Sequence, residues 1–263
     1  MDYFRPSKSK GQNFLINPYL IKKLSDFIPD KGDILIEIGP GKGDFSEFLL
    51  QKDYNHFYLI ELDHILYNYL KERYKEKIAS NKVIIKNLDA TKLDYYSFGI
   101  KNLIVVGNLP YSVGSLIILN IVKHYTYIKE GYFMLQKEVV DKFLLKRNKD
   151  KSFLSVILNI FFDVEYLYTI SPNNFRPRPK VLSSFFKINR KTNFFQEEID
   201  DFFIFIDRVF KYKRKTIINN LKTYYPKDKL ISILNKHGYN EHTRGEDISI
   251  NDFIKIYEDI KNI

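Results

Sequence analysis

The stretch Asn102-Leu-Ile-Val-Val-Gly-Asn-Leu-Pro-Tyr111 begins as a run of branched apolar residues and ends in a polar turn. A short apolar run bounded by glycine is typical of a buried parallel strand. Proline cannot continue a central strand, so we expect the strand to stop at Asn108. Ligands of open α/β sheets bind outside the carboxyl ends of the strands, which is where this turn would lie. An isolated turn of this kind is more often an ordinary connection from strand to helix.

Apolar runs of strand length alternate with helical periodicity on both sides of this stretch. Strands are expected at 34–38, 57–61, 82–88, 103–106 and 131–135. Helices are expected at 19–28, from 44 onward, and at 64–77, 114–127 and 137–146. Such alternation predicts a parallel sheet with helices on both faces.

The pattern changes after Ser152. A helical run to 161 precedes two strands, 164–170 and 183–188, whose proline-rich connection predicts an antiparallel hairpin at the sheet edge. Beyond about 193 every pattern is helical, at 195–210, 213–224, 227–237 and 250–260. We therefore expect an α/β fold with a Rossmann-like, mostly parallel sheet over residues 1–190. A small all-helical domain is expected over residues 191–263.

The composition narrows the class of protein. The chain has 263 residues, 44% of them hydrophobic, which is enough for one sizeable core and a small second one. No apolar run approaches the roughly 18–20 residues of a membrane span, and the N-terminus lacks the apolar core of a secretory signal. Cysteine is absent, which excludes disulfides and thiolate metal sites. We expect a cytoplasmic protein without a membrane partner and without a metal.

The formal net charge of +10 favours a polyanionic partner, although a generally lysine-rich surface would give the same total. Two clusters free of acidic residues are more informative. The first lies between 172 and 191 and includes Arg176, Arg178 and Lys180; the second lies between 208 and 222 and includes Lys213, Arg214 and Lys215. Such local excesses predict contact with nucleic-acid phosphates, whereas any single lysine could simply be solvated.

Polar groups follow four consecutive predicted strands. Gly39, within Gly39-Pro-Gly-Lys-Gly43, follows the first, and Glu61, Asp89 and Asn108 follow the next three. The spacing from the glycines to Glu61 suits an acidic residue that binds ribose hydroxyls. The last glycine of the dinucleotide fingerprint is replaced by Asp44, and a carboxylate there would repel a pyrophosphate. The pattern therefore predicts a nucleoside ligand without phosphates, with Asp89 accepting from an adenine amine.

These residues also carry a family resemblance. Glu37-Ile-Gly-Pro-Gly-Lys-Gly43 looks like the S-adenosylmethionine motif of class I methyltransferases. Further segments resemble, in the same order, the ribosomal RNA adenine N6-dimethyltransferases: 11–15, 108–111, 136–139, 175–181, 214–221 and 244–249. Leu109 between Asn and Pro is typical of the small-subunit (kasugamycin-resistance type) enzymes, whereas the large-subunit antibiotic-resistance methylases usually carry Ile there. The likeness covers nearly the whole chain.

The resemblance implies a set of residue roles. Asn108, Leu109, Pro110 and Tyr111 would hold the target adenine and accept the hydrogens of its amine, and Phe175 would be a second stacking ring. The basic leader, residues 1–18, would close over the cofactor. Cofactor contacts would come from Asn13, Leu15, Gly39, Gly41, Glu61, Asp89 and Asn108. Composition around Phe175 favours an exposed loop, with a core position in the hairpin as the alternative.

The resemblance implies transfer of two methyl groups from S-adenosylmethionine to N6 of each of two adjacent adenines near the 3′ end of small-subunit (16S) rRNA. The substrate would be an immature small subunit, and the enzyme a monomer. One alternative is a large-subunit rRNA methylase that confers antibiotic resistance. A second is a non-catalytic RNA-binding assembly factor on the same fold, and a small-molecule methyltransferase is the weakest.

Overall fold

Contacts in the computed structural model, which describes residues 13–191 and 199–263, divide the chain into two compact units. The first unit comprises Met1–Val140 and Glu165–Arg190, and the second comprises Asp141–Val164 and Lys191–Ile263. The break after Arg190 coincides with the expected change from sheet to helices. Residues 141–164, which we had expected in the first domain, group instead with the C-terminal helices. The expected leader before Asn13 and the start of the helix expected at 195 lie outside the described residues.

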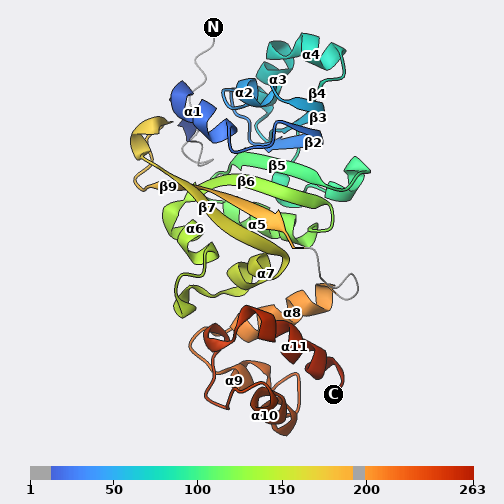
Figure 1. The fold of residues 1–263 in the computed structure, drawn as a ribbon, viewed down its shortest axis with the longest axis vertical. Helices are drawn as coiled ribbons and strands as arrows, with labels where there is room; N and C mark the ends of the chain where they lie inside the picture. Colours follow the sequence, from blue (N-terminus) through green and yellow to red (C-terminus); the bar gives the residue numbers. More distant parts are fainter. Residues whose placement is uncertain (1–12, 192–198) are drawn as a thin grey trace. The chain divides into compact units, whose positions relative to one another are not determined.

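A seven-stranded sheet forms the first unit, in the order β4-β3-β2-β5-β6-β9-β7 (Figure 1). Its strands are β2 (Lys31–Ile38), β3 (Asp53–Ile60), β4 (Val83–Lys86), β5 (Leu103–Asn108), β6 (Ile128–Gln136), β7 (Phe162–Ile170) and β9 (Ser183–Arg190). Strands β2 to β6 pair in parallel, and β9 pairs antiparallel with β6 and lies next to β7 at the edge. The mostly parallel sheet with an antiparallel addition at one edge is confirmed.

Helices cover both faces of this sheet because the strand order reverses. They are α1 (Pro18–Ser25), α2 (Ser46–Leu49), α3 (His64–Arg73), α4 (Lys75–Ala79), α5 (Gly114–Lys123) and α6 (Lys137–Phe143), with 3₁₀ turns η2 (Ala90–Lys92) and η3 (Tyr95–Phe98). Right-handed crossovers put the β2-to-β3 and β5-to-β6 connections on opposite faces. Accordingly, α2 packs with α1, and α5 packs with η2. The helix expected at 64–77 breaks at Tyr74, whose buried hydroxyl donates to the Gly43 carbonyl.

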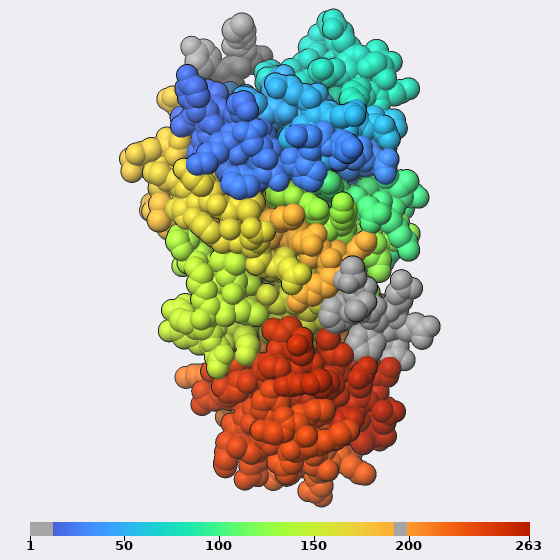
Figure 2. Space-filling view, viewed as in Figure 1, coloured from blue at the N-terminus to red at the C-terminus, as the bar shows by residue number. Residues whose placement is uncertain are grey.

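A second, two-stranded sheet was not predicted. Strand β1 (Phe14–Leu15) pairs antiparallel with β8 (Phe175–Arg176), which follows the 3₁₀ turn η5 (Pro172–Asn174). Beyond the pair, the Ile16 amide donates to the Asn174 carbonyl at 2.9 Å. The blue N-terminal residues and the yellow residues after β7 consequently lie side by side on the face in Figure 2. This pairing attaches the chain before α1 to the proline-rich loop.

The reversal of strand order lies between β2 and β5, where Ile38 pairs with Gly107. A Cβ atom on Gly107 would lie 2.7 Å from the Ile38 carbonyl oxygen, so a larger residue would push the strands apart. This close approach places the residues at the ends of the two strands, Gly39 and Asn108, next to each other. Crevices at such switch points are the usual ligand sites of α/β sheets.

The second unit is mainly helical in its described residues, apart from the start of β7. It contains α7 (Phe153–Phe161), α8 (Ile199–Phe210), α9 (Ile217–Leu221), α10 (Lys227–Lys236) and α11 (Ile250–Lys261), with 3₁₀ turns η4 (Asn148–Asp150) and η6 (Gly245–Asp247). Its core is aromatic, with Phe202 and Tyr257 rings 5.1 Å apart and edge-on. Buried Lys151 donates to the carbonyls of Glu246 and Ile248 and so joins η4 to η6. No helix in the described ranges is long and apolar enough to cross a membrane.

Replacing Gly107 by alanine should separate β2 from β5 at the switch point. We expect Gly107→Ala to lower the free energy of unfolding by about 2–3 kcal/mol, since overpacking against backbone cannot relax cheaply. Urea denaturation followed by circular dichroism measures the loss. Gly99→Ala is the control: no atom lies within 4 Å of its Cβ, and its φ of +71° alone predicts a loss of about 1 kcal/mol. Equal losses would contradict the packing argument.

Candidate active site

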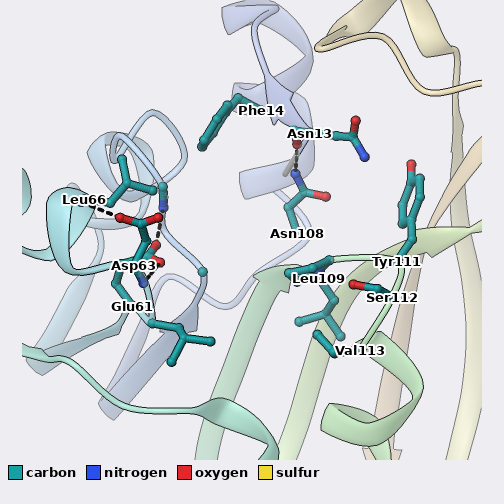
Figure 3. A pocket seen from close by; sticks show the side chains of 14 residues that line it. Asn13, Phe14, Glu61, Asp63, Leu66, Asn108, Leu109, Tyr111, Ser112 and Val113 are labelled. Carbon is teal, nitrogen blue, oxygen red and sulfur yellow. Dashed lines mark hydrogen bonds between the residues drawn. The ribbon is translucent and has the colours of Figure 1, made fainter. Parts of the chain in front are cut away.

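A cavity of about 300 Å³ opens at the carboxyl ends of the central strands. Its walls come from β1, from the loops after β2 and β3, from α3 and from the turn after β5 (Figure 3). It is lined by Asn13, Phe14, Gly39, Gly41, Glu61, Leu62, Asp63, Leu66, Asn108, Leu109, Pro110, Tyr111, Ser112 and Val113. Small-molecule sites begin at about this size and likewise combine apolar walls with a few convergent polar groups.

The glycine loop, residues 39–43, forms one wall. Gly39 and Gly41 have φ values of +64° and +61°, a region that other residues enter only with strain. A Cβ on Gly41 would lie 2.6 Å from a ring carbon of Phe14, so a side chain there would displace the ring. The glycines therefore let the chain turn sharply and leave backbone, rather than side chains, at the cavity wall.

Glu61 stands opposite the turn after β5 and connects two elements of the site. Its Oε2 accepts from the Gly41 amide at 3.2 Å, and its Oε1 accepts from the Asp63 amide at 2.8 Å. Burial raises the pKa of Glu61, and the two amide hydrogen bonds partly offset this because they favour the carboxylate. Asp63 in turn caps α3, with Oδ1 accepting from the amides of Ile65 and Leu66.

A second carboxyl lies beneath the glycine loop. Glu37 is 2% exposed, and Ser46 donates to its Oε2 at 2.5 Å. Burial is the main cause that raises the Glu37 pKa to about 8, with smaller contributions from the carboxylates of Glu61 and Asp44. Glu37 is therefore largely protonated at neutral pH and supports the loop as a neutral hydrogen-bonding group.

The turn after β5 presents an oriented amide and an aromatic ring. The Asn108 Nδ2 donates to the Asn13 carbonyl at 2.7 Å, which turns its Oδ1 toward the side where Tyr111 lies (Figure 3). Leu109 is buried, and its amide donates to the Met134 carbonyl. The Pro110 carbonyl accepts from the amides of Val113 and Gly114 and begins α5. The Tyr111 hydroxyl bonds to Ser183 Oγ, and burial raises its pKa.

The structure thus brings most of the predicted residues together. Asn13, Gly39, Gly41, Glu61 and Asn108 to Tyr111 all line the cavity, whereas Asp89 and Leu15 are not among its lining residues. Asp89 instead caps η2, with Oδ1 accepting from the Thr91 amide and hydroxyl. Leu15 is 8% exposed and packs in the core below the cavity.

The expectation that Phe175 is exposed is wrong. Its side chain is 3% exposed and belongs to the same core cluster as Leu15, its partner in the β1–β8 pair. Successive side chains of a strand point to opposite faces, so Phe175 turns inward while Arg176 is exposed. Loop composition suggested the opposite because the charged residues that follow Phe175 are exposed and separated by half-buried prolines.

Sequence reasoning missed other lining residues. The sequence could have predicted the position of Asp63, since an aspartate just before a helical run is a typical N-cap. No sequence pattern predicts that Phe14 and Leu66 line the cavity, because their positions depend on pairing and packing between distant segments. Glu37 belongs to the motif at residues 37–43, and its burial follows from a strand covered on both faces.

The predicted basic residues are exposed. Arg176, Arg178 and Lys180 project from the proline-rich loop of the first unit. Lys213, Arg214 and Lys215 lie between α8 and α9 in the second, where Lys213 also donates to the Lys149 carbonyl. In the described parts of the chain, His, Asp and Glu side chains form no group of three that could hold a metal ion.

The fold is similar to that of two solved RNA methyltransferases. A dimethyladenosine transferase from Plasmodium falciparum superposes with a TM-score of 0.79 at 23% identity, covering 95% of this chain and 98% of that one. The 23S rRNA methyltransferase ErmE superposes with a TM-score of 0.69 at 20% identity, covering 95% and 100%. Together with the glycine-lined cavity at the switch point, this likeness defines a class I methyltransferase fold.

The sequence relatives are more specific. The family model described as ribosomal RNA adenine dimethylase matches residues 3–262. The ribosomal RNA small subunit methyltransferase A of Sulfurihydrogenibium sp. (strain YO3AOP1) is 34% identical over 271 residues, covering 100% of this chain and 99% of that protein. The chain therefore belongs to the ribosomal RNA adenine dimethylase family.

The buried carboxyl of Glu37 predicts a pH-dependent stability. Because its folded pKa of about 8 exceeds the ordinary 4.5, the folded state retains a proton that the unfolded chain releases between these values. The contribution of Glu37 is thus fully present below pH 4.5 and is lost as the pH rises to about 8, by at most ~1.4 kcal/mol per pH unit.

Replacing Glu37 by the uncharged isostere glutamine should remove this dependence. We expect Glu37→Gln and the parent to unfold at the same urea concentration near pH 4, with the variant increasingly more stable up to pH 8. Glu61 is present in both proteins, so its own pH dependence is common to the two curves apart from its coupling to Glu37. Parallel stability curves over this range would contradict the assignment of a buried, protonated Glu37.

Proposed function

We propose that this chain transfers methyl groups from S-adenosylmethionine to N6 of two adjacent adenines near the 3′ end of small-subunit rRNA. One observation supports this most strongly. In a member of the adenine dimethylase family, Asn108 and Tyr111 face Glu61 across a single cavity. That arrangement suits a nucleoside cofactor on one side and a flipped adenine on the other.

The residues at the cavity fit the cofactor. The Glu61 carboxylate can accept from ribose hydroxyls, as it now accepts from the amides of Gly41 and Asp63. A Cβ on Gly41 would displace the Phe14 ring, so glycine keeps both the loop backbone and this ring at the cavity wall. The Asn13 carbonyl accepts a hydrogen bond from Asn108 Nδ2 and so joins the segment before β1 to the site. S-adenosylmethionine supplies an activated methyl group, and the chain positions its acceptor.

The turn after β5 supplies the groups that the acceptor needs. The lone pair of an adenine amine is delocalised into the ring, and two hydrogen-bond acceptors for its N–H groups favour a localised lone pair. Asn108 Oδ1 is the first acceptor. We assign the second to the Leu109 carbonyl, since the Pro110 carbonyl already accepts from Val113 and Gly114. Because both oxygens are held in place before reaction, they act by preorganised orientation and dipoles.

The Tyr111 ring at the cavity wall is the stacking surface for the flipped base. A stacking role for Phe175 would require its ring to leave the core, so Tyr111 is the better candidate in this conformation. Asp89 caps η2 through Oδ1, and its other carboxylate oxygen, Oδ2, is the one we assign to the cofactor's adenine amine.

The two exposed basic clusters suit an RNA substrate, with Arg176, Arg178 and Lys180 on one unit and Lys213, Arg214 and Lys215 on the other. We propose an immature small ribosomal subunit as the substrate, a monomeric enzyme and a cytoplasmic location. Leu109 and the small-subunit relative favour this over the large-subunit alternative, whose fold the chain shares through ErmE. The intact Asn108 to Tyr111 turn argues against a binding-only factor.

Methyl transfer to under-methylated small subunits tests the proposed reaction. With tritiated S-adenosylmethionine, we expect label in dimethyladenosine at two adjacent adenines near the 3′ end. Asn108→Ala should lower kcat by about 100-fold or more, because it removes an acceptor aimed at the reacting amine. Asn55→Ala, on an exposed asparagine of β3, is the control and should leave kcat unchanged.

Other outcomes would redirect the assignment. Label on protein-free large-subunit RNA, but none on small subunits, would support the antibiotic-resistance methylase. An Asn108→Ala variant with full transfer would contradict the role of the turn, and a chain that binds small subunits without any transfer would support the assembly factor.

The basic clusters predict a measurable salt dependence. Each phosphate that a variant no longer neutralises should reduce the slope of log K against log salt by about 0.7–0.9. We expect Lys213→Gln and Arg214→Gln each to weaken small-subunit RNA binding and to reduce this slope, as measured by filter binding over a salt series. Lys71→Gln, an exposed lysine of α3 outside both clusters, should leave the slope unchanged. An unchanged slope in the first two variants would contradict a role in phosphate binding.

A further inference from the structure

Two exposed tyrosines of the second unit flank one lysine. Tyr212 lies in the loop between α8 and α9 and is 59% exposed; Tyr224 follows α9 and is 40% exposed. The Lys211 ammonium lies 5.8 Å from the Tyr212 ring centroid and 5.9 Å from that of Tyr224. It also donates to the Tyr224 hydroxyl at 3.3 Å. Through Lys211, these contacts link the ring of Tyr212, before α9, to the ring of Tyr224, after α9.

One face of the Tyr224 ring is already stacked. The guanidinium carbon of Arg208 lies 3.9 Å from the ring centroid, and Arg208 Nη1 reaches the Tyr225 hydroxyl at 3.4 Å. A cation against one face holds the ring in place, while the exposed fraction leaves other ring surface open to solvent. Most of the described rings of this unit are buried, whereas Tyr224 is exposed and has a cation against one face.

The loop that carries Tyr212 is held by buried groups. Asn220 is 3% exposed, and its Nδ2 donates to the carbonyls of Val209 and Tyr212 at 2.7 and 3.2 Å. The Lys215 amide donates to the same Tyr212 carbonyl. At the end of the loop, Thr216 forms a β-bridge with Arg244, the first residue of the Arg244–Ser249 segment. A loop fixed at both ends can present side chains with little ordering cost.

The surroundings are strongly positive. Lys211, Lys213, Arg214, Lys215 and Lys222 are exposed, and no acidic residue occurs between 208 and 222. The nearest acidic residue before this segment, Asp207, is exposed on α8. Proteins that bind single strands combine such a charged surface with aromatic faces, because every base can stack and every nucleotide carries a phosphate.

We propose that Tyr212 and the Arg208-backed Tyr224 form a stacking platform that binds unpaired bases of the RNA substrate beside the phosphate contacts of Lys213, Arg214 and Lys215. This inference rests on the proposed function. It specifies that the second unit binds a loop or single strand of the RNA rather than a duplex. Stacking supplies affinity with little preference for sequence, so the platform anchors the substrate while specificity stays at the methylation site.

Binding of a short single-stranded RNA with one 2-aminopurine per strand tests the platform in the full chain. Stacking on a tyrosine quenches 2-aminopurine, and the chain has no tryptophan to interfere. We expect quenching with the parent protein, and a loss of quenching together with about tenfold weaker binding in Tyr224→Leu and in Tyr212→Leu. Tyr224→Phe keeps the ring and should retain both. Tyr69→Leu, on a tyrosine of α3 that is 48% exposed, is the control.

Salt dependence separates stacking from charge. The tyrosine variants should keep the salt slope of the parent, whereas Lys215→Gln, on an exposed lysine, should reduce it by about 0.7. Unchanged quenching and affinity in both leucine variants would overturn the platform, as would an equal loss in Tyr224→Phe. Methyl transfer by the same proteins to small subunits is a separate measurement. Absence of transfer by the parent would refute the proposed function. The binding and quenching measurements would still test the stacking platform independently.

Discussion

The close approach of β5 to β2 at Gly107 is the constraint on which the candidate site depends. The sheet grows from β2 toward β4 in one direction and from β5 toward β7 in the other, so no connection fills the space above the reversal. Gly107 lies against the Ile38 carbonyl, so a larger residue there would displace one of the two strand ends. Gly39 and Asn108 stand at those ends, and the glycine loop and the turn after β5 line the cavity between them.

The site also contains groups that oppose folding. The carboxyls of Glu37 and Glu61 are 2% and 6% exposed, and burial raises the pKa of both. Glu61 is partly compensated by two backbone amides, which a sugar's hydroxyls could replace. Perturbed carboxyls in a cavity are typical of functional sites rather than of optimised cores. Of the two, Glu61 lines the cavity, whereas Glu37 lies beneath the glycine loop.

The sequence predicted the central part of the fold because its signals are local. Apolar runs ending in Gly39, Glu61 and Asn108 identified three strands and the side chains at their ends, and parallel pairing then brings those ends to one edge. The sequence did not predict features that depend on contacts between distant segments. Strands of two residues, such as β1 and β8, have no periodicity to detect, and their pairing buries Phe175 in what looked like an exposed basic loop. The predicted helix 64–77 breaks at Tyr74, whose hydroxyl donates to the Gly43 carbonyl, a long-range contact that local periodicity does not reveal.

A crystal structure of the complex with S-adenosylhomocysteine tests the central claim most directly. The account predicts the nucleoside in the cavity, with the Glu61 carboxylate bonded to the ribose hydroxyls in place of the Gly41 amide, and the sulfur on the side of Asn108 and Tyr111. A ligand bound elsewhere, or bound without contact to Glu61, would contradict the assignment of the switch-point cavity as the methyl-donor site.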